Sequence, residues 1–435
     1  MAADVLERVE SDGAFADLAL AAELDRRRAT TRDAALATEL VYGTLRWQRY
    51  LDWILQPHAN RPLARLDAGV RVLLRLTAYQ IAFLARVPAF AAVNDAVTLA
   101  GGAPGIAGFV NAVLRSFARR GSREREPPPP RDPLEALATR SSFPTWLAGR
   151  WVERYGLDDA ETLMRALNER APLTVRANTR RTTREALAAR LAAEHGLTTR
   201  ATAWAPEGLV VERGGSPDTW RAFAEGDCVV QDEASMLIAR LLEPRPGSTV
   251  ADVCAAPGTK TTHLAALMEN RGRVLAVDPE AARLGLVRES ARRCGFEIVE
   301  THEGTVADVA PRWASACDAV LVDAPCTNLG VVRRNPDVKW RRGLGDLAAA
   351  AARQRAILAA AAIMVRSGGR LVYATCSLEP EENDAVVRAF LRERPDFGVD
   401  PPDAFPLPLG ADGALRCLPH RHGTDGFTAF RLRRS

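Results

Sequence analysis

Apolar residues recur every three or four positions through the first 119 residues, and short polar stretches separate the runs. The clearest runs cover residues 33–55, 69–87 and 108–120. Apolar positions at this spacing form one face of an α-helix, which a globular protein buries against other helices. The pattern therefore predicts an all-helical domain over residues 1–130.

The end of this domain is marked by the segment "GSREREPPPPRDP", residues 121–133. Proline lacks the backbone N–H that a helix interior needs, and a run of four prolines favours an extended spacer. We therefore expect a linker between the helical domain and the next one.

A small α+β module is predicted over residues 131–240. After a helical pattern up to about residue 170, strand-like stretches at 172–179, 198–205 and 208–215 flank a helical stretch at 183–196. Short strands alternating with a helix are typical of such a module.

Arginines gather around the first strand of this module, and they have two interpretations. A row of cations can follow the phosphate backbone of RNA, whereas such runs more often form a solvated charged face. We retain Arg176 as a candidate RNA contact. The row consists of Arg176, Arg180, Arg181 and Arg184.

From residue 241 onward, near-continuous apolar stretches alternate with helical ones. Strands that are apolar throughout are buried on both faces, which is typical of a parallel sheet between two layers of helices. The pattern predicts an α/β fold with a Rossmann-like catalytic domain over residues 241–435. Its predicted strands are 248–256, 272–278, 318–325 and 369–376.

The composition is that of an ordinary soluble protein. Hydrophobic residues make up 47% and charged residues 26% of the 435 positions, and no apolar run reaches the roughly 20 residues of a membrane span. The start of the chain lacks the apolar stretch of a secretory signal, so we expect the seven cysteines to stay reduced in the cytoplasm. No cysteine or histidine cluster has zinc spacing, and we expect no metal. The net charge of +4 permits nucleic-acid binding without arguing for it.

Lysine usage is a sharper feature of the composition. Of the 58 basic residues only Lys260 and Lys339 are lysines. Lysine carries a compact point charge where arginine carries a planar fork, so these positions are candidates for sites where a guanidinium does not fit. The alternative is chance survival under a composition bias.

The stretch "CAAPGTKTTH", residues 254–263, follows the first strand of the α/β region. Dinucleotide and phosphate-loop motifs require further glycines at fixed positions, and here Gly258 stands alone. Asp278 ends the next strand, where a carboxylate can accept hydrogen bonds from both ribose hydroxyls of an adenosine. These features predict a nucleoside cofactor without a pyrophosphate, which S-adenosylmethionine satisfies. The alternative for Asp278 is a simple helix cap.

Two further strands end in "VDAPC", residues 322–326, and in "YATC", residues 373–376. The carboxyl ends of parallel strands line one ligand crevice, so we expect Asp323, Cys326 and Cys376 to face one cavity. A thiolate that adds to carbon 6 of a pyrimidine makes carbon 5 nucleophilic enough to accept a methyl group. The alternative interpretation is that either cysteine is only a small residue of the hydrophobic core.

Four motifs and the helical front half of the chain resemble a known family. The motifs that carry the likeness are "CAAPGTKTTHLA", "VLVDAPCTNLGVVRRNPDVKW", "LVYATCSLEPEEN" and "DGFTAFRLRR". They are similar to the motifs of the RNA cytosine-carbon-5 methyltransferases of the NOL1/NOP2/sun family. The front half, with "LVYGTLRW" and "FVNAVLR", resembles the NusB-like RNA-binding domain. The combination is similar to the bacterial branch that modifies small-subunit 16S ribosomal RNA.

The resemblance implies roles for individual residues. It makes Cys376 the nucleophile, Cys326 the residue that helps release the product, and Asp323 the residue that holds the cytosine edge. "RRNPDVKW" follows the catalytic strand and should lie at the mouth of the crevice, so Arg333, Arg334 and Lys339 are candidate RNA contacts. The implied cofactor contacts are Cys254, Ala255, Ala256, Pro257, Gly258, Thr259, Lys260, Asp278, Glu303 and Asp323.

Two positions depart from the family pattern. The family turn reads Ala-Pro-Gly-Gly-Lys, and Thr259 replaces its second glycine, so we expect the backbone there to avoid a positive φ. After the third strand the family carries an aspartate near the adenine, whereas this chain offers Glu303.

The sequence thus predicts a monomer that methylates carbon 5 of a cytidine in ribosomal RNA, with the base swung out of its stack. A transfer RNA methyltransferase with the same chemistry is one alternative. A non-catalytic RNA-binding or antitermination factor is another, and retention of both strand-end cysteines and Asp323 argues against it.

Overall fold

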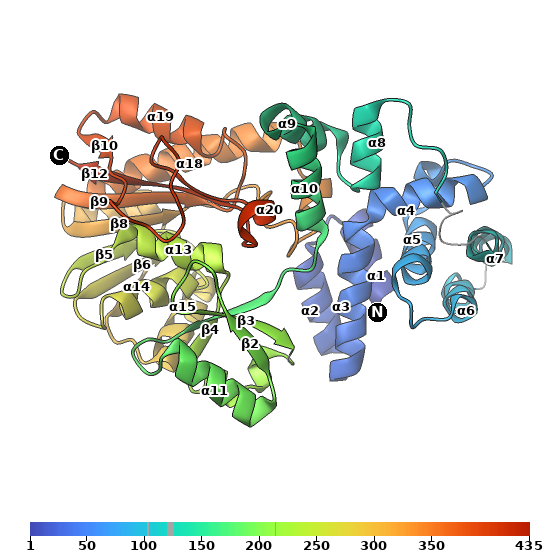
Figure 1. The fold of residues 1–435 in the computed structure, drawn as a ribbon, viewed down its shortest axis with the longest axis horizontal. Helices are drawn as coiled ribbons and strands as arrows, with labels where there is room; N and C mark the ends of the chain where they lie inside the picture. Colours follow the sequence, from blue (N-terminus) through green and yellow to red (C-terminus); the bar gives the residue numbers. More distant parts are fainter. Residues whose placement is uncertain (102–103, 120–125, 214) are drawn as a thin grey trace. The chain divides into compact units, whose positions relative to one another are not determined.

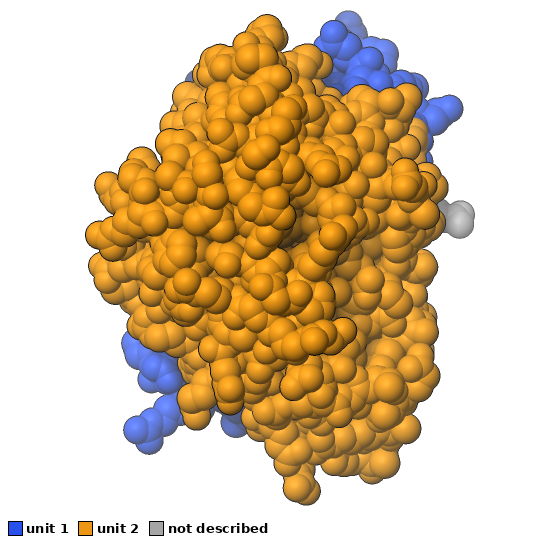
Figure 2. Space-filling view, turned by 90° about the vertical axis from the view of Figure 1, so that its left-hand side faces the viewer, with its two compact units in different colours: residues 1–170, 332–341 blue, residues 171–331, 342–435 orange. Residues whose placement is uncertain are grey.

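The computed structural model describes residues 1–101, 104–119, 126–213 and 215–435. Residues 121–125 of the predicted linker lie outside the described residues, and residues 126–130 have no regular secondary structure. The chain forms two compact units, shown in different colours in Figure 2. Unit 1 comprises residues 1–170 and 332–341, and unit 2 comprises residues 171–331 and 342–435.

Unit 1 is helical in the part of the chain that the structure describes, as predicted (Figure 1). Polar residues start several helices. The side-chain oxygen of Thr30 accepts from Asp33 N, and that of Asp132 accepts from Glu135 N just before Pro133. The helices are α1 (Ala2–Ser11), α2 (Ala16–Arg26), α3 (Thr31–Arg46), α4 (Gln48–Leu55), α5 (Ala68–Phe83), α6 (Ala89–Leu99), α7 (Pro104–Arg119), α8 (Pro133–Arg140), α9 (Thr145–Tyr155), α10 (Leu157–Asn168) and α17 (Val338–Arg341).

Two features of unit 1 differ from the simple domain order that the sequence suggests. Helices α8 to α10 group with the front helices rather than with the α+β module, because unit 1 continues through Arg170. Residues 332–341, which follow the predicted catalytic strand, also belong to unit 1. The chain therefore leaves unit 2 shortly after Cys326 and returns to it ten residues later.

Unit 2 begins with a four-stranded antiparallel sheet in the order β2-β3-β1-β4. Leu187 and Leu191 of the helix that covers it are buried with Trp220 in one core cluster. This agrees with the predicted α+β pattern. The elements are β1 (Leu173–Ala177), α11 (Arg184–His195), β2 (Thr198–Ala201), β3 (Gly208–Arg213), α12 (Arg221–Ala224) and β4 (Cys228–Val230).

The second sheet of unit 2 has eight strands. Five of them run parallel in the order β9-β8-β5-β6-β7, as the sequence predicts for a Rossmann-like fold. They are β5 (Thr249–Asp252), β6 (Arg273–Asp278), β7 (Val299–Glu303), β8 (Cys317–Asp323) and β9 (Val365–Thr375). The remaining three extend the sheet antiparallel beyond β9, so the sheet is mixed rather than wholly parallel. They are β10 (Phe397–Val399), β11 (Leu415–Cys417) and β12 (Phe427–Arg434).

Helices cover both faces of this sheet (Figure 1). Successive strand residues face opposite ways, so Leu321 packs in the cluster with α13 and α14, whereas Val320 packs in the cluster with α18. The helices are α13 (Glu233–Leu242), α14 (Thr259–Leu267), α15 (Ala281–Cys294), α16 (Val306–Val309), α18 (Leu344–Met364), α19 (Asp384–Glu393) and α20 (Pro419–His422). Helix α18 is long and apolar enough to cross a membrane, but Leu358 and Ala362 are buried in the core beneath it. It has the contacts of a core helix.

Candidate active site

The parallel register brings three carboxylates and a cysteine to one edge of the large sheet. Asp278, the last residue of β6, pairs with Glu303, the last residue of β7. Asp323, the last residue of β8, pairs with Ala374, and Cys376 follows two residues later. Four predicted site residues thus lie at adjacent strand ends, which is where an open parallel sheet binds its ligands.

The two predicted thiols are in contact. The Sγ atoms of Cys326 and Cys376 lie 3.0 Å apart. Oδ1 of Asn328 accepts from both, at 3.3 Å from Cys326 Sγ and 3.0 Å from Cys376 Sγ. Both cysteines are half-buried, and Cys376 packs against the core cluster of the large sheet.

A buried carboxylate holds the loop that carries Cys326. Glu382 accepts from Thr327 N at 2.9 Å, from the Thr327 hydroxyl, and from Gln354 Nε2 at 2.9 Å. The Glu382 side chain is fully buried, so these bonds form in a low-dielectric interior where they are strong and costly to lose. Sequence reasoning missed this role, although the acids of "SLEPEEN" directly follow the second cysteine.

The turn after Cys376 is pinned by an amide. Nδ2 of Asn383 donates to the carbonyl oxygens of Ser377 and Glu379, both at 2.9 Å. Oδ1 of Asn383 accepts from the Thr375 hydroxyl at 2.6 Å. The backbone on both sides of Cys376 is therefore fixed by one side chain.

Lys260 and Asp323 form an ion pair beside the thiols. Nζ of Lys260 lies 2.6 Å from Oδ2 of Asp323 and 5.0 Å from the centre of the Phe427 ring. Burial lowers the pKa of Lys260, but the attraction and hydrogen bond of Asp323 outweigh it and leave that pKa raised. Lys260 is therefore a permanent cation here rather than a base.

Cys376 is a thiol rather than a thiolate in this arrangement. The hydrogen bond with Cys326 and burial raise the pKa of Cys376 well above its ordinary value, and Asp323 adds to the effect. The attraction of Lys260 acts in the opposite direction but does not outweigh them. A further positive charge near the site would favour the reactive thiolate.

The predicted cofactor turn leads from β5 into α14, and Gly258 caps the helix with φ +103°. A Cβ at Gly258 would lie 3.0 Å from Cα of Val287, so a side chain there would be both strained and crowded. Thr259 begins α14 and has no positive φ, as predicted. The rest of the turn consists of Cys254, Ala255, Ala256 and Pro257.

Asp278 faces this turn. Its carboxylate accepts from Ala256 N at 3.4 Å and Glu280 N at 3.1 Å, and Arg283 Nη1 lies 3.2 Å from Oδ2. Asp278 is 2% exposed, and these three donors leave one of the four acceptor positions of its carboxylate for a ribose hydroxyl. Glu303, its neighbour on β7, is exposed and open to a ligand.

Asp252, at the end of β5, is a site residue that sequence reasoning missed. Its Oδ2 accepts from the Thr261 hydroxyl at 2.7 Å, whereas its buried Oδ1 has no hydrogen-bond partner among the described residues. Burial raises the pKa of Asp252 to about 7. Carboxylates at three neighbouring strand ends suit a cofactor that carries a ribose, an ammonium and a sulfonium, so the residues present fit S-adenosylmethionine.

Two predicted RNA contacts lie elsewhere. Lys339 is fully buried in unit 1, where its Nζ donates to Arg46 O at 2.8 Å and to Asn168 Oδ1 at 2.9 Å. Arg333 is also buried in unit 1, and its carbonyl oxygen accepts from Arg46 Nη2 at 3.0 Å. Arg334, beside it, is half-buried. A side chain without solvent access cannot contact a phosphate, so Lys339 is corrected to a structural role.

Arg176 is likewise corrected. It is 1% exposed on β1 and donates to Gln231 Oε1, to Thr259 O at 2.8 Å and to Thr262 Oγ1 at 3.0 Å. Burial lowers its pKa to about 10. Arg176 therefore ties the small sheet to the first turn of α14 and does not face RNA.

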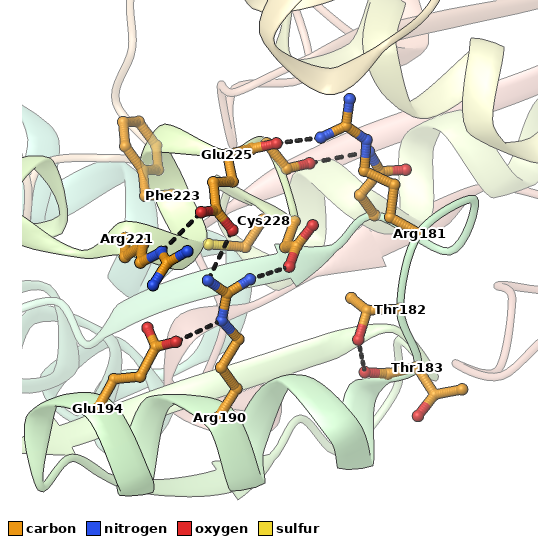
Figure 3. Close-up of polar contacts among 12 residues, drawn as sticks. Arg181, Thr182, Thr183, Arg190, Glu194, Arg221, Phe223, Glu225 and Cys228 are labelled. Atoms are coloured by element: carbon orange, nitrogen blue, oxygen red, sulfur yellow. Dashed lines mark hydrogen bonds and ion pairs between the residues drawn. The ribbon is translucent and has the colours of Figure 1, made fainter.

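The other arginines of the small module have mixed surroundings (Figure 3). Arg190 pairs with Glu194 at 2.8 Å, Glu225 at 2.7 Å and Asp227 at 2.5 Å. Arg181 donates to the carbonyl oxygen of Glu225. Arg190 is thus balanced by acids of the module, and Arg184 of the predicted row pairs with Glu185 at 3.0 Å. These ion pairs favour the interpretation of a solvated charged face for the two arginines.

Comparisons with protein families cover most of the chain. Residues 239–433 match the family described as "16S rRNA methyltransferase RsmB/F". Residues 1–119 match the NusB family, and residues 143–217 match the ferredoxin-like domain of the RsmF/B-like methyltransferases. Along the chain, the three matches follow one another in the order NusB, ferredoxin-like domain and methyltransferase.

Individual relatives are similar over their full length. The chain is 36% identical to "Ribosomal RNA small subunit methyltransferase B" of Pseudomonas putida, over 98% of this chain and 96% of the relative. It is 37% identical to the Bacillus subtilis protein named "Probable ribosomal RNA small subunit methyltransferase B". That match covers 100% of this chain and 98% of the relative.

Solved structures are similar as well. "Crystal Structure of PH0851" matches with a TM-score of 0.83 and 29% identity, over 99% of this chain and 97% of that one. The structure of NSun6 from Pyrococcus horikoshii with SFG matches with a TM-score of 0.62 and 27% identity, over 68% and 99%.

Proposed function

The chain belongs to the RsmB/F family of 16S rRNA methyltransferases, and from this premise we propose that it methylates carbon 5 of a cytidine in small-subunit ribosomal RNA with S-adenosylmethionine. The observation that carries the proposal is the contact of two thiols, 3.0 Å apart, at adjacent strand ends beside Asp323. Methylation of an exocyclic amine needs no thiol, whereas carbon 5 of a pyrimidine needs covalent activation.

Cys376 is the nucleophile in this proposal. Its Sγ gives up a proton and adds to carbon 6, and the electron pair of the 5,6 double bond moves to carbon 5. Carbon 5 would then bond to the methyl group as the bond from that methyl group to the sulfonium sulfur of S-adenosylmethionine breaks, and S-adenosylhomocysteine would leave. When the proton on carbon 5 is removed, the double bond re-forms and the carbon–sulfur bond breaks. Cys326, in contact with Cys376, assists this last step.

The ion pair orients the base. Asp323 is 26% exposed at its side chain, whereas Lys260 is 9% exposed, so Asp323 offers the free edge of the pair to a ligand. A carboxylate in that position accepts hydrogen bonds from the exocyclic amine of cytosine. Lys260 holds the carboxylate in place.

The cofactor is held by the turn at residues 254–260 and by the carboxylates of Asp278 and Glu303. When bound, S-adenosylmethionine supplies the methyl group and a positive charge near the thiols. The match to a structure determined with SFG, an analogue of S-adenosylmethionine, supports this assignment. The NusB-like helices dock the RNA, and the protein acts as a monomer in the cytoplasm.

The test is a methylation assay with the full chain, labelled S-adenosylmethionine and 16S ribosomal RNA, followed by digestion to nucleosides. We expect the label in 5-methylcytidine. Label in an N-methylated nucleoside would overturn the carbon 5 assignment. In a parallel assay with transfer RNA in place of 16S ribosomal RNA, more efficient labelling would overturn the proposed substrate.

A further inference from the structure

Asn328 lies two residues after Cys326 and is not part of the mechanism described above. Its φ is +64°, a left-handed conformation that asparagine tolerates better than most residues with a side chain. Its amide oxygen lies within hydrogen-bond distance of both active-site sulfurs. Asn328 Oδ1, Cys326 Sγ and Cys376 Sγ form a triangle whose sides are 3.0 to 3.3 Å long.

The backbone around Asn328 is fixed, so the triangle does not depend on a free loop. Gly330 N donates to Cys376 O at 2.9 Å, and Val331 N donates to Asn328 O at 3.1 Å. A Cβ at Gly330 would lie 2.3 Å from the carbonyl oxygen of Gly426, so the loop packs closely against neighbouring backbone. The preceding residue, Thr327, is bonded to the buried Glu382.

The amide oxygen of Asn328 favours the protonated form of the neighbouring thiols. A carbonyl oxygen can only accept, so it binds a thiol and not a thiolate. A hydrogen bond to the neutral form of an acid disfavours its ionisation. Among the described residues, the charged and titratable groups near the two thiols include Asp323 at the end of β8, Lys260 on α14 and Tyr373 on β9. Glu382 is a fourth, since it accepts from Thr327 N next to Cys326.

We propose that Asn328 is a positioning residue that aims both thiols at one point and keeps Cys376 protonated until the substrate and cofactor arrive. This inference goes beyond the proposed function and rests on it only for the effect on turnover. A thiol that gives up its proton to attack the base loses its bond to Asn328, so the amide holds the resting state and not the reacting one.

Asn328→Asp and Asn328→Gly test the proposal because they should shift the pH dependence of Cys376 reactivity in opposite directions. Aspartate keeps the shape and adds a negative charge beside both sulfurs, whereas glycine keeps the left-handed backbone and removes the acceptor. The matched control is Asn270→Asp, because Asn270 also has a left-handed backbone, with φ +54°, and bonds to Glu297 N rather than to a sulfur.

The first measurement is the pH dependence of iodoacetamide labelling of Cys376 in the full chain, followed by peptide mass spectrometry. Asn328→Asp should move the labelling midpoint up by roughly one pH unit or more, and Asn328→Gly should move it down. Asn270→Asp should match the parent. This readout needs neither RNA nor cofactor, so its failure is distinguishable from failure of the proposed methylation.

The second measurement separates positioning from binding. Asn328→Gly removes the acceptor that aims Cys376, and this loss of aim should lower kcat about tenfold or more even though the thiol ionises more readily. KM for the RNA should stay within about twofold, because the amide acts on the thiols and not on the bound RNA. Midpoints of both Asn328 variants that coincide with the parent, or that move in the same direction, would overturn the proposal. If Asn328→Asp fails to fold by circular dichroism, the downward shift in Asn328→Gly decides the question alone.

Discussion

The ammonium of Lys260 lies 2.6 Å from the carboxylate of Asp323. Lys260 belongs to the first turn of α14, and Asp323 ends β8, so this ion pair joins the cofactor turn to the catalytic strand. Asp323 raises the pKa of Cys376 and Lys260 lowers it, so the two charges oppose each other at the thiol. The pair therefore acts on the thiol that we propose as the nucleophile.

Lys260 and Asp323 should act as a unit, so that removing both costs less than the sum of removing each. Lys260→Met leaves Asp323 as an uncompensated charge beside Cys376, and we expect single-turnover methyl transfer to slow about tenfold or more. Asp323→Asn in the Lys260→Met background should cost less than the sum of the two single changes, because the substitutions share one interaction. Full additivity would show that the pair does not act as a unit.

The second lysine leads to a prediction about stability. Burial, with the nearby guanidinium of Arg46, holds the pKa of Lys339 well below its ordinary value. The pKa of this lysine in the unfolded chain is 10.5, and folding lowers it. Below pH 10.5 the unfolded state therefore binds more protons than the folded state, so the free energy of unfolding decreases as pH falls. The melting temperature of unit 1 should therefore rise between pH 7 and pH 10 in the parent chain and rise less in Lys339→Met.

A binding experiment distinguishes this role from the original RNA hypothesis. Lys339→Met should leave the salt dependence of RNA binding unchanged, since each lost phosphate contact would reduce the slope by somewhat under one unit. Arg334→Gln, at the half-buried neighbour, is the comparison. A reduced slope in Lys339→Met would restore the RNA hypothesis.

The two lysines show what sequence reasoning can and cannot reach. Rare lysines among arginines marked both positions as unusual, and both are indeed sites with specific contacts. Only Lys260 lies in the active site, however. The partners of Lys339 are Arg46 and Asn168, which are 293 and 171 residues away in the chain. Local patterns carry no information on contacts at such separations.

The strand ends were predictable for a physical reason. Parallel strands must end at the same edge, so Asp278, Asp323 and Cys376 could be placed together from apolar runs alone. The antiparallel strands β10 and β11 have three residues each, too short for a periodic pattern. Asn328 and Asp252 were missed because their roles depend on distances to other side chains rather than on their own spacing.

Asp252 gives a pH prediction of the opposite sign from Lys339. Its pKa rises from 3.8 to about 7 on burial, so its contribution to stability is present below pH 3.8 and is lost as pH rises through about 7. Asp252→Asn keeps an acceptor for Thr261 and cannot ionise. The melting temperature of unit 2 in Asp252→Asn, relative to the parent, should therefore increase from pH 5 to pH 8. A difference that does not change with pH would show that Asp252 titrates normally.

The final prediction assigns the two thiols, which the 3.0 Å contact alone leaves interchangeable. Cys376→Ala cannot form the bond to carbon 6 and should be inactive, because carbon 5 then lacks activation. Cys326→Ala can still attack and transfer the methyl group but should release the product slowly. A covalent protein–RNA species should then accumulate and survive denaturing electrophoresis.

Cys417→Ala is the control, because Cys417 is fully buried in the core beside the site and has no part in the mechanism. It should turn over without trapping RNA. An adduct in Cys376→Ala and none in Cys326→Ala would reverse the two roles. Mass spectrometry of the adduct from Cys326→Ala completes the assignment. The peptide bound to RNA must contain Cys376 if this residue is the nucleophile. If both variants stay fully active and neither traps RNA, the thiols take no part in covalent catalysis.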